Sequence, residues 1–403
     1  EFSQERYSTY HHKVAQLGAS LFPGYRTIEV THMKGGSFNR VIGLTLTPPG
    51  PRKYTWDWFC REWKSLFGRS GSETLEEYIL RIPRMSWLSN LDADIATLQF
   101  VGPHLDLPIP RSVHYDLSED NVIGAQYMLQ QRLRGQTLSP IFDRLNLAQK
   151  VSIARQVTQL VHQLASVTSD AGGRPARMSA SGFSHQLEQL EIPSRTISWD
   201  LNPAEPVPST PQSPVDFLIG LCKRWNAWDD EEHGGEIVYE EIWHGLAGVA
   251  RGLEELGFLD ADNIFYLCHG DLQPYNLLVE VRDEEHVEIT GILDWDSAIF
   301  APSFMAYKPP YWLWYPAEAA TREFDREESA NIEPASEHGR VMKQIFLKNA
   351  SPEFLKYAFA PEAIIARKVL THLRHGFKHK AHAEMAMATI EEWQQLHPDP
   401  EDD

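Results

Sequence analysis

The sequence contains few cysteines and no long apolar run. Its three cysteines, Cys60, Cys222 and Cys268, lie far apart and match no zinc-binding spacing, so we expect free thiols in a reducing compartment. No apolar run approaches the roughly 18 residues that a membrane-spanning helix needs. The N-terminus lacks the apolar core of a signal peptide, although a leader missing before Glu1 stays an alternative. These absences predict a cytoplasmic chain with no membrane partner.

Positive charge is also scarce. The chain has 37 Lys and Arg against 56 Asp and Glu, a formal net charge of -19 at pH 7. Nucleic-acid binding depends on clustered Lys and Arg that neutralise phosphates, so this balance argues against a nucleic-acid partner. It is compatible with a cationic small-molecule substrate, although acidity more often serves solubility. The 403 residues, 42% of them hydrophobic, suit a globular protein with two lobes.

Hydrophobic periodicity divides the chain near residue 130. Before that point, alternating apolar residues predict a small, mainly antiparallel sheet with one inserted helix. Residues 48–78, with Pro and Gly at both ends, interrupt the strands as an inserted excursion. Farther along the chain helical patterns dominate, broken by a Pro/Ser-rich loop at residues 193–214. Besides the amphipathic segment that starts at Leu147, helices are expected near residues 215–229, 236–256, 336–348, 352–376 and 383–396.

Two short motifs carry oxygen-bearing side chains at fixed spacings. "HGDLQPYN" places Asp271 five residues before Asn276, and "ILDWD" places Asp294 at the end of an apolar run. Magnesium prefers oxygen ligands, which an amide carbonyl and a carboxylate supply. A separate Asp can accept a proton from an attacking hydroxyl group. The apolar runs "NLLVEV" and "ITGIL" can pair as a hairpin, which would return Asp294 to the neighbourhood of Asn276.

Together these motifs resemble the aminoglycoside phosphotransferase and choline kinase superfamily, which shares its fold with the protein kinases. "GGSFNRVIGL", "YILRIPR" and "DIATLQFV" are similar to segments of its large fungal aminoglycoside-phosphotransferase-like group, and the resemblance covers roughly residues 25–320. It implies an α+β, bilobal protein-kinase-like fold. Residues 1–130 would form a small antiparallel-sheet lobe that binds nucleotide. Residues 131–403 would form a larger, mainly helical lobe with the catalytic loop at 269–276, the metal motif at 292–296 and the acceptor region.

The resemblance also implies roles for the residues of the two motifs. Asp271 would be the catalytic base, while Asn276 and Asp294 would bind one or two Mg²⁺ ions that bridge the phosphates of ATP. His269 would brace the loop rather than transfer a proton. Gly270 stands where many protein kinases have an Arg that senses activation-loop phosphorylation, so we expect no such regulation.

The nucleotide-binding residues of the first lobe follow from the same resemblance. Gly35, Gly36 and Ser37 would cover the phosphates, since glycines let backbone amides approach anionic oxygens; alone, such a turn is usually only a hairpin. Arg81 occupies the place of the usual strand lysine, and Asp94 that of the helix acid that pairs with it. The alternative is that the two residues do not pair, so that Arg81 is only a cation at a strand edge and Asp94 only a solvated acid on a helix.

Three further sets of residues are less directly informative. The Gln130 carbonyl and the Arg132 amide occupy the positions that hydrogen-bond adenine in the family. Trp312 and Trp314 would face the acceptor, although aromatic stripes more often belong to the core. The histidine-rich stretch at residues 372–382 has helical spacing, but its flanking Lys and Arg favour a solvated basic face over a metal site.

The sequence therefore predicts a phosphotransferase that moves the γ-phosphoryl group of ATP, with Mg²⁺, to the hydroxyl group of a small molecule. The acceptor could be cationic, and its identity is not readable from the sequence. A nucleotide-binding pseudokinase with an interaction role is an alternative, because Arg81 replaces the usual lysine. A protein or lipid kinase is a further alternative that the absence of an activation segment disfavours.

Overall fold

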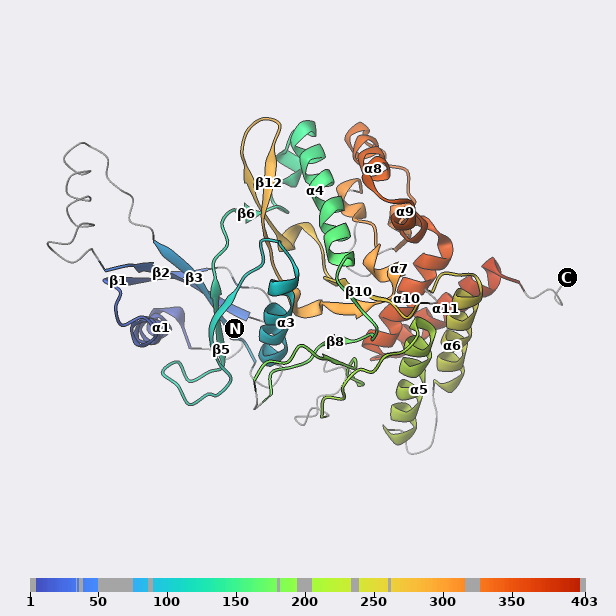
Figure 1. Ribbon diagram of the computed structural model, residues 1–403, viewed down its shortest axis with the longest axis horizontal. Coiled ribbons are helices and arrows are strands. Elements are labelled where there is room, and N and C mark those ends of the chain that lie inside the picture. The colour runs from blue at the N-terminus through green and yellow to red at the C-terminus, as the bar shows by residue number, and fades with distance from the viewer. Residues whose placement is uncertain are drawn as a thin grey trace. The chain divides into compact units, whose positions relative to one another are not determined.

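The computed structural model describes residues 5–33, 35, 39–49, 75–85, 90–179, 182–193, 205–232, 239–259, 262–315 and 327–398 (Figure 1). The chain divides into two compact units. Unit 1 comprises Glu1–Gln99 and Pro110–Leu133, and unit 2 comprises Phe100–Ile109 and Arg134–Asp403. Most of the expected excursion at residues 48–78 lies outside the described residues.

Unit 1 is built on one five-stranded sheet in which every neighbouring pair is antiparallel, in the order β1-β2-β3-β5-β4. Its strands are β1 Thr27–His32, β2 Asn39–Thr47, β3 Glu76–Pro83, β4 Ser112–Asp116 and β5 Tyr127–Gln131, with helix α1 at Tyr7–Leu21. Helix α3, Leu91–His104, begins in unit 1, and its residues from Phe100 onward belong to unit 2. The small antiparallel sheet that the sequence predicts is present; β1 and β2 pair with Thr27 opposite Thr47 and His32 opposite Ile42.

The core of unit 1 lies between α1 and the sheet. Alternate residues of β2 point to one face, because successive strand side chains point to opposite faces; Ile42 and Leu44 are at most 2% exposed. They pack in one cluster with Leu80 of β3 and with Val14 and Leu17 of α1. The alternation that predicted the strands is thus also what builds the core of this unit.

Unit 2 is mainly helical, with small sheets among the helices (Figure 1). Its helices are α4 Leu147–Ala165, α5 Pro214–Glu232, α6 Glu240–Glu255, α7 Ser303–Ala306, α8 Glu337–Asn349, α9 Pro352–Phe359, α10 Pro361–His375 and α11 Lys380–Leu396. Its strands are β6 Gln136–Thr137, β7 Thr168–Ser169, β8 Arg174–Pro175, β9 Leu187–Glu188, β10 Phe265–Cys268, β11 Leu277–Val281, β12 Val287–Ile292 and β13 Ile299–Ala301. Short 3-10 helices are η2 Phe142–Arg144, η3 Pro274–Asn276, η4 Trp295–Ser297, η5 Tyr311–Leu313 and η6 Glu327–Ala330.

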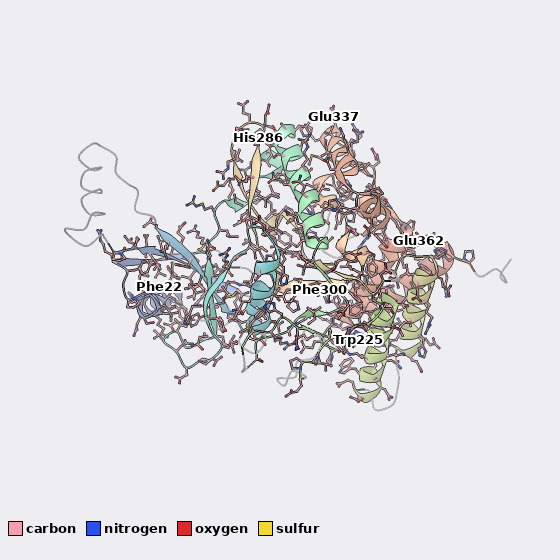
Figure 2. The ribbon with its side chains drawn as sticks, viewed as in Figure 1. Phe22, Trp225, His286, Phe300, Glu337 and Glu362 are labelled. Atoms are coloured by element: carbon pink, nitrogen blue, oxygen red, sulfur yellow. The ribbon has the colours of Figure 1, made fainter. Side chains whose placement is uncertain are left out.

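Large aromatic side chains hold the helices of unit 2 together. Trp225 of α5, labelled in Figure 2, stacks on Trp243 of α6 with ring centroids 5.7 Å apart. Trp243 in turn stacks on Phe377 at 4.2 Å. The indole N–H of Trp225 donates to the carbonyl of Leu373 in α10, at 2.7 Å. This bond satisfies the one polar group that the burial of Trp225 removes from water.

Helix α4 supports the tip half of the hairpin of β11 and β12. The two strands pair antiparallel from Leu277 opposite Ile292 to Val281 opposite Val287, and His286 lies near the hairpin tip (Figure 2). The hydroxyl group of Ser152 in α4 donates to the carbonyl of Val287 at 3.1 Å. Helix α4 therefore fixes the tip half of this hairpin within unit 2.

The predicted fold class is confirmed, with two differences in detail. The helix expected at residues 352–376 is two helices, because Pro361 lacks the N–H that would continue α9 and instead begins α10. Within the loop expected at residues 193–214, Pro208 forms a bridge with Glu188. None of the helices in the described part of the chain combines the length and the apolar character that crossing a membrane requires.

Candidate active site

The segment that carries Asp271 connects the end of β10 to the start of β11. Gly270 adopts a φ of +83°, and Pro274 begins the 3-10 helix η3, where its fixed φ favours a helical turn. The indole N–H of Trp312 donates to the carbonyl of Leu272 at 3.1 Å, and the amide of Ser139 donates to the carbonyl of Pro274 at 3.1 Å. These bonds fix the loop from two sides.

Asp271 and Asn276 are in direct contact. The side-chain amide of Asn276 donates to carboxylate Oδ2 of Asp271 at 2.9 Å and to its backbone carbonyl at 2.9 Å. Asn276 is 5% exposed, whereas Asp271 is half-buried. Because the amide nitrogen bonds to Asp271, the side-chain oxygen of Asn276 is the atom that can bind a cation.

The hairpin brings the second motif back to the loop. The amide of Leu293 donates to the backbone carbonyl of Asn276 at 2.8 Å. The next residue, Asp294, is exposed and has a φ of +65°. Non-glycine residues adopt a positive φ only at a cost in conformational energy, and such residues concentrate at functional sites. The return of Asp294 to the neighbourhood of Asn276 thus follows from the strand pairing.

His269 connects the two motifs from the interior. Its Nε2 donates to the carbonyl of Leu293 at 2.9 Å, and its Nδ1 accepts from the amide of Asp271 at 3.3 Å. Its ring lies against Trp295, with centroids 4.6 Å apart. Burial lowers the pKa of His269 to about 4, against the opposing effects of the Leu293 carbonyl and of Asp271 and Asp296. A neutral imidazole with one donor and one acceptor matches both bonds.

The neutral state of His269 predicts a loss of stability in acid. Because its folded pKa is about 4 and its ordinary value is 6.5, the unfolded chain binds a proton first as the pH falls. The contribution of the neutral His269 to the free energy of unfolding is therefore fully present above pH 6.5. It is lost progressively as the pH falls toward 4. Between pH 7 and pH 5 we expect His269 to account for a loss of about 2 kcal/mol in the free energy of unfolding, measured by urea titration.

The matched control for this prediction is His269→Gln. Glutamine keeps a donor and an acceptor but does not titrate, so the decrease in stability between pH 7 and pH 5 should be smaller by about 2 kcal/mol. The same decrease in both proteins would show that another group causes the acid sensitivity.

A contact behind the loop explains why residue 270 is glycine. A Cβ at this position would lie 2.3 Å from the carbonyl oxygen of Ser297 and 2.8 Å from its Cβ. The guanidinium of Arg374 reaches the same carbonyl oxygen at 3.4 Å. The loop and the η4 turn that follows Asp294 are therefore packed backbone against backbone.

Tyr275 was missed by the sequence reasoning. Its hydroxyl group donates to Oδ1 of Asp271 at 2.8 Å, and the residue is 52% exposed. The only signal in the sequence is its spacing of four residues from Asp271, which has a definite geometric meaning in a helix but not in a loop. Its contact with Asp271 is visible only in the folded loop.

In unit 1, Arg81 and Asp94 form the ion pair that the sequence suggests. The Arg81 Nη2 atom lies 3.3 Å from the Asp94 Oδ2 atom, and their side chains are 11% and 8% exposed. The alternative of a solvated helix acid is therefore wrong. Largely buried pairs of this kind depend on both partners, because removal of one leaves a charge out of water.

The other residues that the sequence assigned to the nucleotide belong to the segment before β2, to β5 and to the residue after β5. Gly36 and Ser37 lie outside the described residues. A Cβ on Gly35 would lie 2.5 Å from the carbonyl oxygen of Asn39. Gln130 is buried in β5. The amide of Arg132 donates to the carbonyl of Glu77 at 3.0 Å, continuing the pairing with β3, so we do not assign this amide to adenine.

The structure decides the open alternatives for the aromatic and histidine-rich segments. Trp312 and Trp314 are 8% and 3% exposed and belong to the core; Trp314 packs 5.2 Å from Phe346. The solvated basic face expected at residues 372–382 is only partly present, because some of its side chains are half-buried. His372 is half-buried, bonds to the hydroxyl group of Thr389 at 3.1 Å, and burial lowers its pKa to about 4.

Unit 2 thus brings together four of the expected residues, which are His269, Asp271, Asn276 and Asp294. Unit 1 separately brings together Arg81 and Asp94. The thiol of Cys268, next to the loop, is buried, and burial raises its pKa to about 12. A thiol of this kind is not a nucleophile at neutral pH.

One family model and several curated proteins match parts of this chain. A model of the phosphotransferase enzyme family matches residues 68–303. A subtelomeric hrmA-associated cluster protein of Aspergillus fumigatus is 25% identical over 145 residues, which are 36% of this chain and 24% of that protein. Clavilactone A biosynthesis cluster protein Y of Ampulloclitocybe clavipes is 21% identical over 254 residues, 56% of this chain and 54% of that protein. The chain spans about a quarter and about half of the lengths of these curated relatives.

Two solved structures are similar over most of the chain. The GDP complex of wild-type aminoglycoside 2'-phosphotransferase-IIIa is 14% identical, covers 96% of this chain and 99% of that chain, and has a TM-score of 0.44. A ternary complex of a thermostable mutant of aminoglycoside phosphotransferase APH(4)-Ia with AMP-PNP and hygromycin B is 15% identical. It covers 94% of this chain and 98% of that chain, with a TM-score of 0.46.

Proposed function

The chain belongs to the phosphotransferase enzyme family, and we propose that it transfers the γ-phosphoryl group of ATP to the hydroxyl group of a small molecule. The observation that carries this proposal is the contact between Asp271 and Asn276, together with the backbone bond that joins Asn276 to the residue before Asp294. A base and two oxygen ligands at these spacings are the parts with which protein kinases perform phosphoryl transfer.

Asp271 is the proposed base. Its carboxylate accepts the proton of the acceptor hydroxyl while the acceptor oxygen forms a bond to the γ-phosphorus. The bond from that phosphorus to the oxygen bridging the β- and γ-phosphates breaks, and ADP leaves. The buried amide of Asn276 holds one carboxylate oxygen of Asp271, so the orientation of the base is set before the acceptor binds. Most of the lowering of the barrier comes from this alignment and from charge neutralisation.

The donor set fits Mg²⁺. Asn276 supplies a side-chain oxygen and Asp294 a carboxylate, both of the hard type that Mg²⁺ prefers. Among the described residues there is no group of three or more His, Cys, Asp or Glu that could hold a metal ion. A protein usually supplies one or two of the ligands of a Mg²⁺ ion, and substrate phosphates and water supply the others. When bound, Mg²⁺ neutralises the charge of the phosphates.

Unit 1 would contribute the anchor of the triphosphate. Arg81 is held by Asp94 and offers a planar fork of donors that matches phosphate oxygens. We propose that Gly35, Gly36 and Ser37 cover the phosphates. Arg81 in the place of the usual lysine keeps a nucleotide-binding pseudokinase as the second candidate. Stabilisation by nucleotide without turnover would favour that candidate.

The experiment is a screen for the acceptor. The protein is incubated with ATP, Mg²⁺ and a pool of hydroxyl-bearing metabolites that includes choline, ethanolamine, homoserine, glucose, kanamycin and hygromycin B. We expect one component to gain the mass of one phosphoryl group. Reactions with EDTA, and with the Asp294→Ala variant, serve as blanks and should show no gain. No gain above these blanks, with nucleotide binding intact, would reject the proposed activity.

A further inference from the structure

The carboxylate of Asp271 is held at both of its oxygens, and the two partners differ in character. Oδ2 accepts from the amide of Asn276, a residue that is 5% exposed. Oδ1 accepts from the hydroxyl group of Tyr275, a residue that is 52% exposed. The interior of unit 2 therefore covers one oxygen, and an exposed phenol marks the side from which a solute can reach the other.

Tyr275 is presented by a rigid turn. Pro274 precedes it at the start of η3, and the amide of Asn276 closes the turn on the carbonyl of Gln273 at 2.9 Å. Asn276 is anchored in turn by Leu293. The position of the Tyr275 backbone is thus set by the same contacts that set the candidate base. A rigid support of this kind can hold a hydroxyl group at a constant distance from Asp271.

Folding alone does not explain this contact. A hydrogen bond between exposed groups exchanges bonds to water for a bond within the protein, so its net contribution to stability is small. The ring of Tyr275 gains little from burial because half of the residue stays in solvent. The contact does, however, restrict the rotation of the Asp271 carboxylate, which the proposed reaction requires to be aligned.

We propose that Tyr275 is a positioning residue for the Asp271 carboxylate and a wall of the acceptor site. Its hydroxyl group takes one lone pair of Oδ1 and orients the other toward the incoming acceptor hydroxyl. A carboxylate oxygen accepts two hydrogen bonds, so the acceptor joins Tyr275 at this atom and does not displace it. The exposed ring supplies a flat face for the body of the acceptor. This role rests on the proposed phosphotransferase function.

The test separates the hydroxyl group from the ring. Tyr275→Phe removes only the hydroxyl, and Tyr275→Ala removes both. The acceptor is the compound of the metabolite pool with the highest wild-type turnover. For Tyr275→Phe we expect kcat to fall about 10-fold with the KM for acceptor and for ATP changed less than about 2-fold, because the lost bond acts on alignment. Tyr275→Ala should show the same fall in kcat and an acceptor KM raised about 10-fold.

The control is Tyr115→Phe, which removes a hydroxyl group from β4 of unit 1 and should leave kcat and KM as in the wild type. Thermal denaturation should show all variants folded, since Tyr275 is exposed. A Tyr275→Phe variant with wild-type kcat rejects the positioning role, and a Tyr275→Ala variant with wild-type KM rejects the contact with the acceptor. A wild type that phosphorylates no compound above its Asp294→Ala blank rejects the underlying function instead.

Discussion

Replacement of Asp271 by asparagine is expected to lower kcat for phosphoryl transfer by about 10²–10⁴-fold, the usual contribution of a positioned general base. Asparagine has nearly the same shape but cannot take a proton from the acceptor. The Asn276 amide and the Tyr275 hydroxyl, which both donate to the carboxylate, lose a charged acceptor. Steady-state kinetics with the acceptor identified by the mass screen would measure the loss.

Binding measurements distinguish a lost base from a lost site. Calorimetric titration with ATP and Mg²⁺ should give Asp271→Asn an affinity within a few-fold of the wild type, because the proposed metal ligands are Asn276 and Asp294. Glu284→Gln, at the exposed tip of the β11–β12 hairpin, removes the same charge from unit 2 and should retain full activity. An Asp271→Asn variant that keeps more than about a tenth of the wild-type kcat would contradict the assignment of the base.

The strand pattern of the sequence was sufficient to predict the hairpin, and the family resemblance was sufficient to predict the ion pair. The strand pattern of residues 277–292 has one pairing that buries its apolar residues on one face, and that pairing determines where Asp294 lies. Arg81 and Asp94 could be matched because the resemblance supplied the positions of a strand cation and a helix acid. Arg81 lies in β3 and Asp94 in α3, so the direction of each of these side chains follows from its position in the sequence. Asp294 follows the end of β12, so the pairing determines its place but not the direction of its side chain.

Contacts that depend on irregular backbone could not be predicted in this way. Tyr275 reaches Asp271 through a loop whose path is set by Pro274 and by the remote Trp312. The protonation of His269 depends on its burial beside Trp295. Trp312 itself could equally have lined a pocket or filled the core, since an aromatic stripe does not reveal which face is covered. Such contacts lie in irregular loops or join residues far apart in sequence, where periodicity carries no information.

The second large effect is expected from Gly270→Ala. Alanine at a φ of +83° has an unfavourable backbone conformation, which costs about 1–2 kcal/mol. Its Cβ would also lie 2.3 Å from the carbonyl oxygen of Ser297, an atom of the backbone that cannot rotate away. Overpacking of this kind costs a further 1–3 kcal/mol. We therefore expect the free energy of unfolding to fall by about 2–5 kcal/mol, measured by urea titration.

The same substitution should also lower activity, because the loop can relieve the clash only by moving away from the η4 turn. A displacement of about 1 Å between Asp271 and the groups that follow Asp294 is enough to lower kcat about 100-fold. Activity would be measured at a temperature low enough for the Gly270→Ala variant to stay folded. The variant should then show this loss of kcat with little change in its far-ultraviolet circular dichroism spectrum. Full activity would mean that the packing of Gly270 against Ser297 does not set the geometry of the loop.

The control variant Gly257→Ala separates the energetic cost of a positive φ from the cost of the clash with Ser297. Gly257 follows α6 with a φ of +71°, similar to that of Gly270, but a Cβ there would have no atom within 4 Å. This variant should therefore lose only about 1–2 kcal/mol of stability and keep its activity. If both glycine variants lost the same stability, the contact with Ser297 would contribute nothing. A larger loss confined to Gly270→Ala would locate the constraint at the junction of the two motifs, where the proposed base and the proposed metal ligands depend on the same backbone contact.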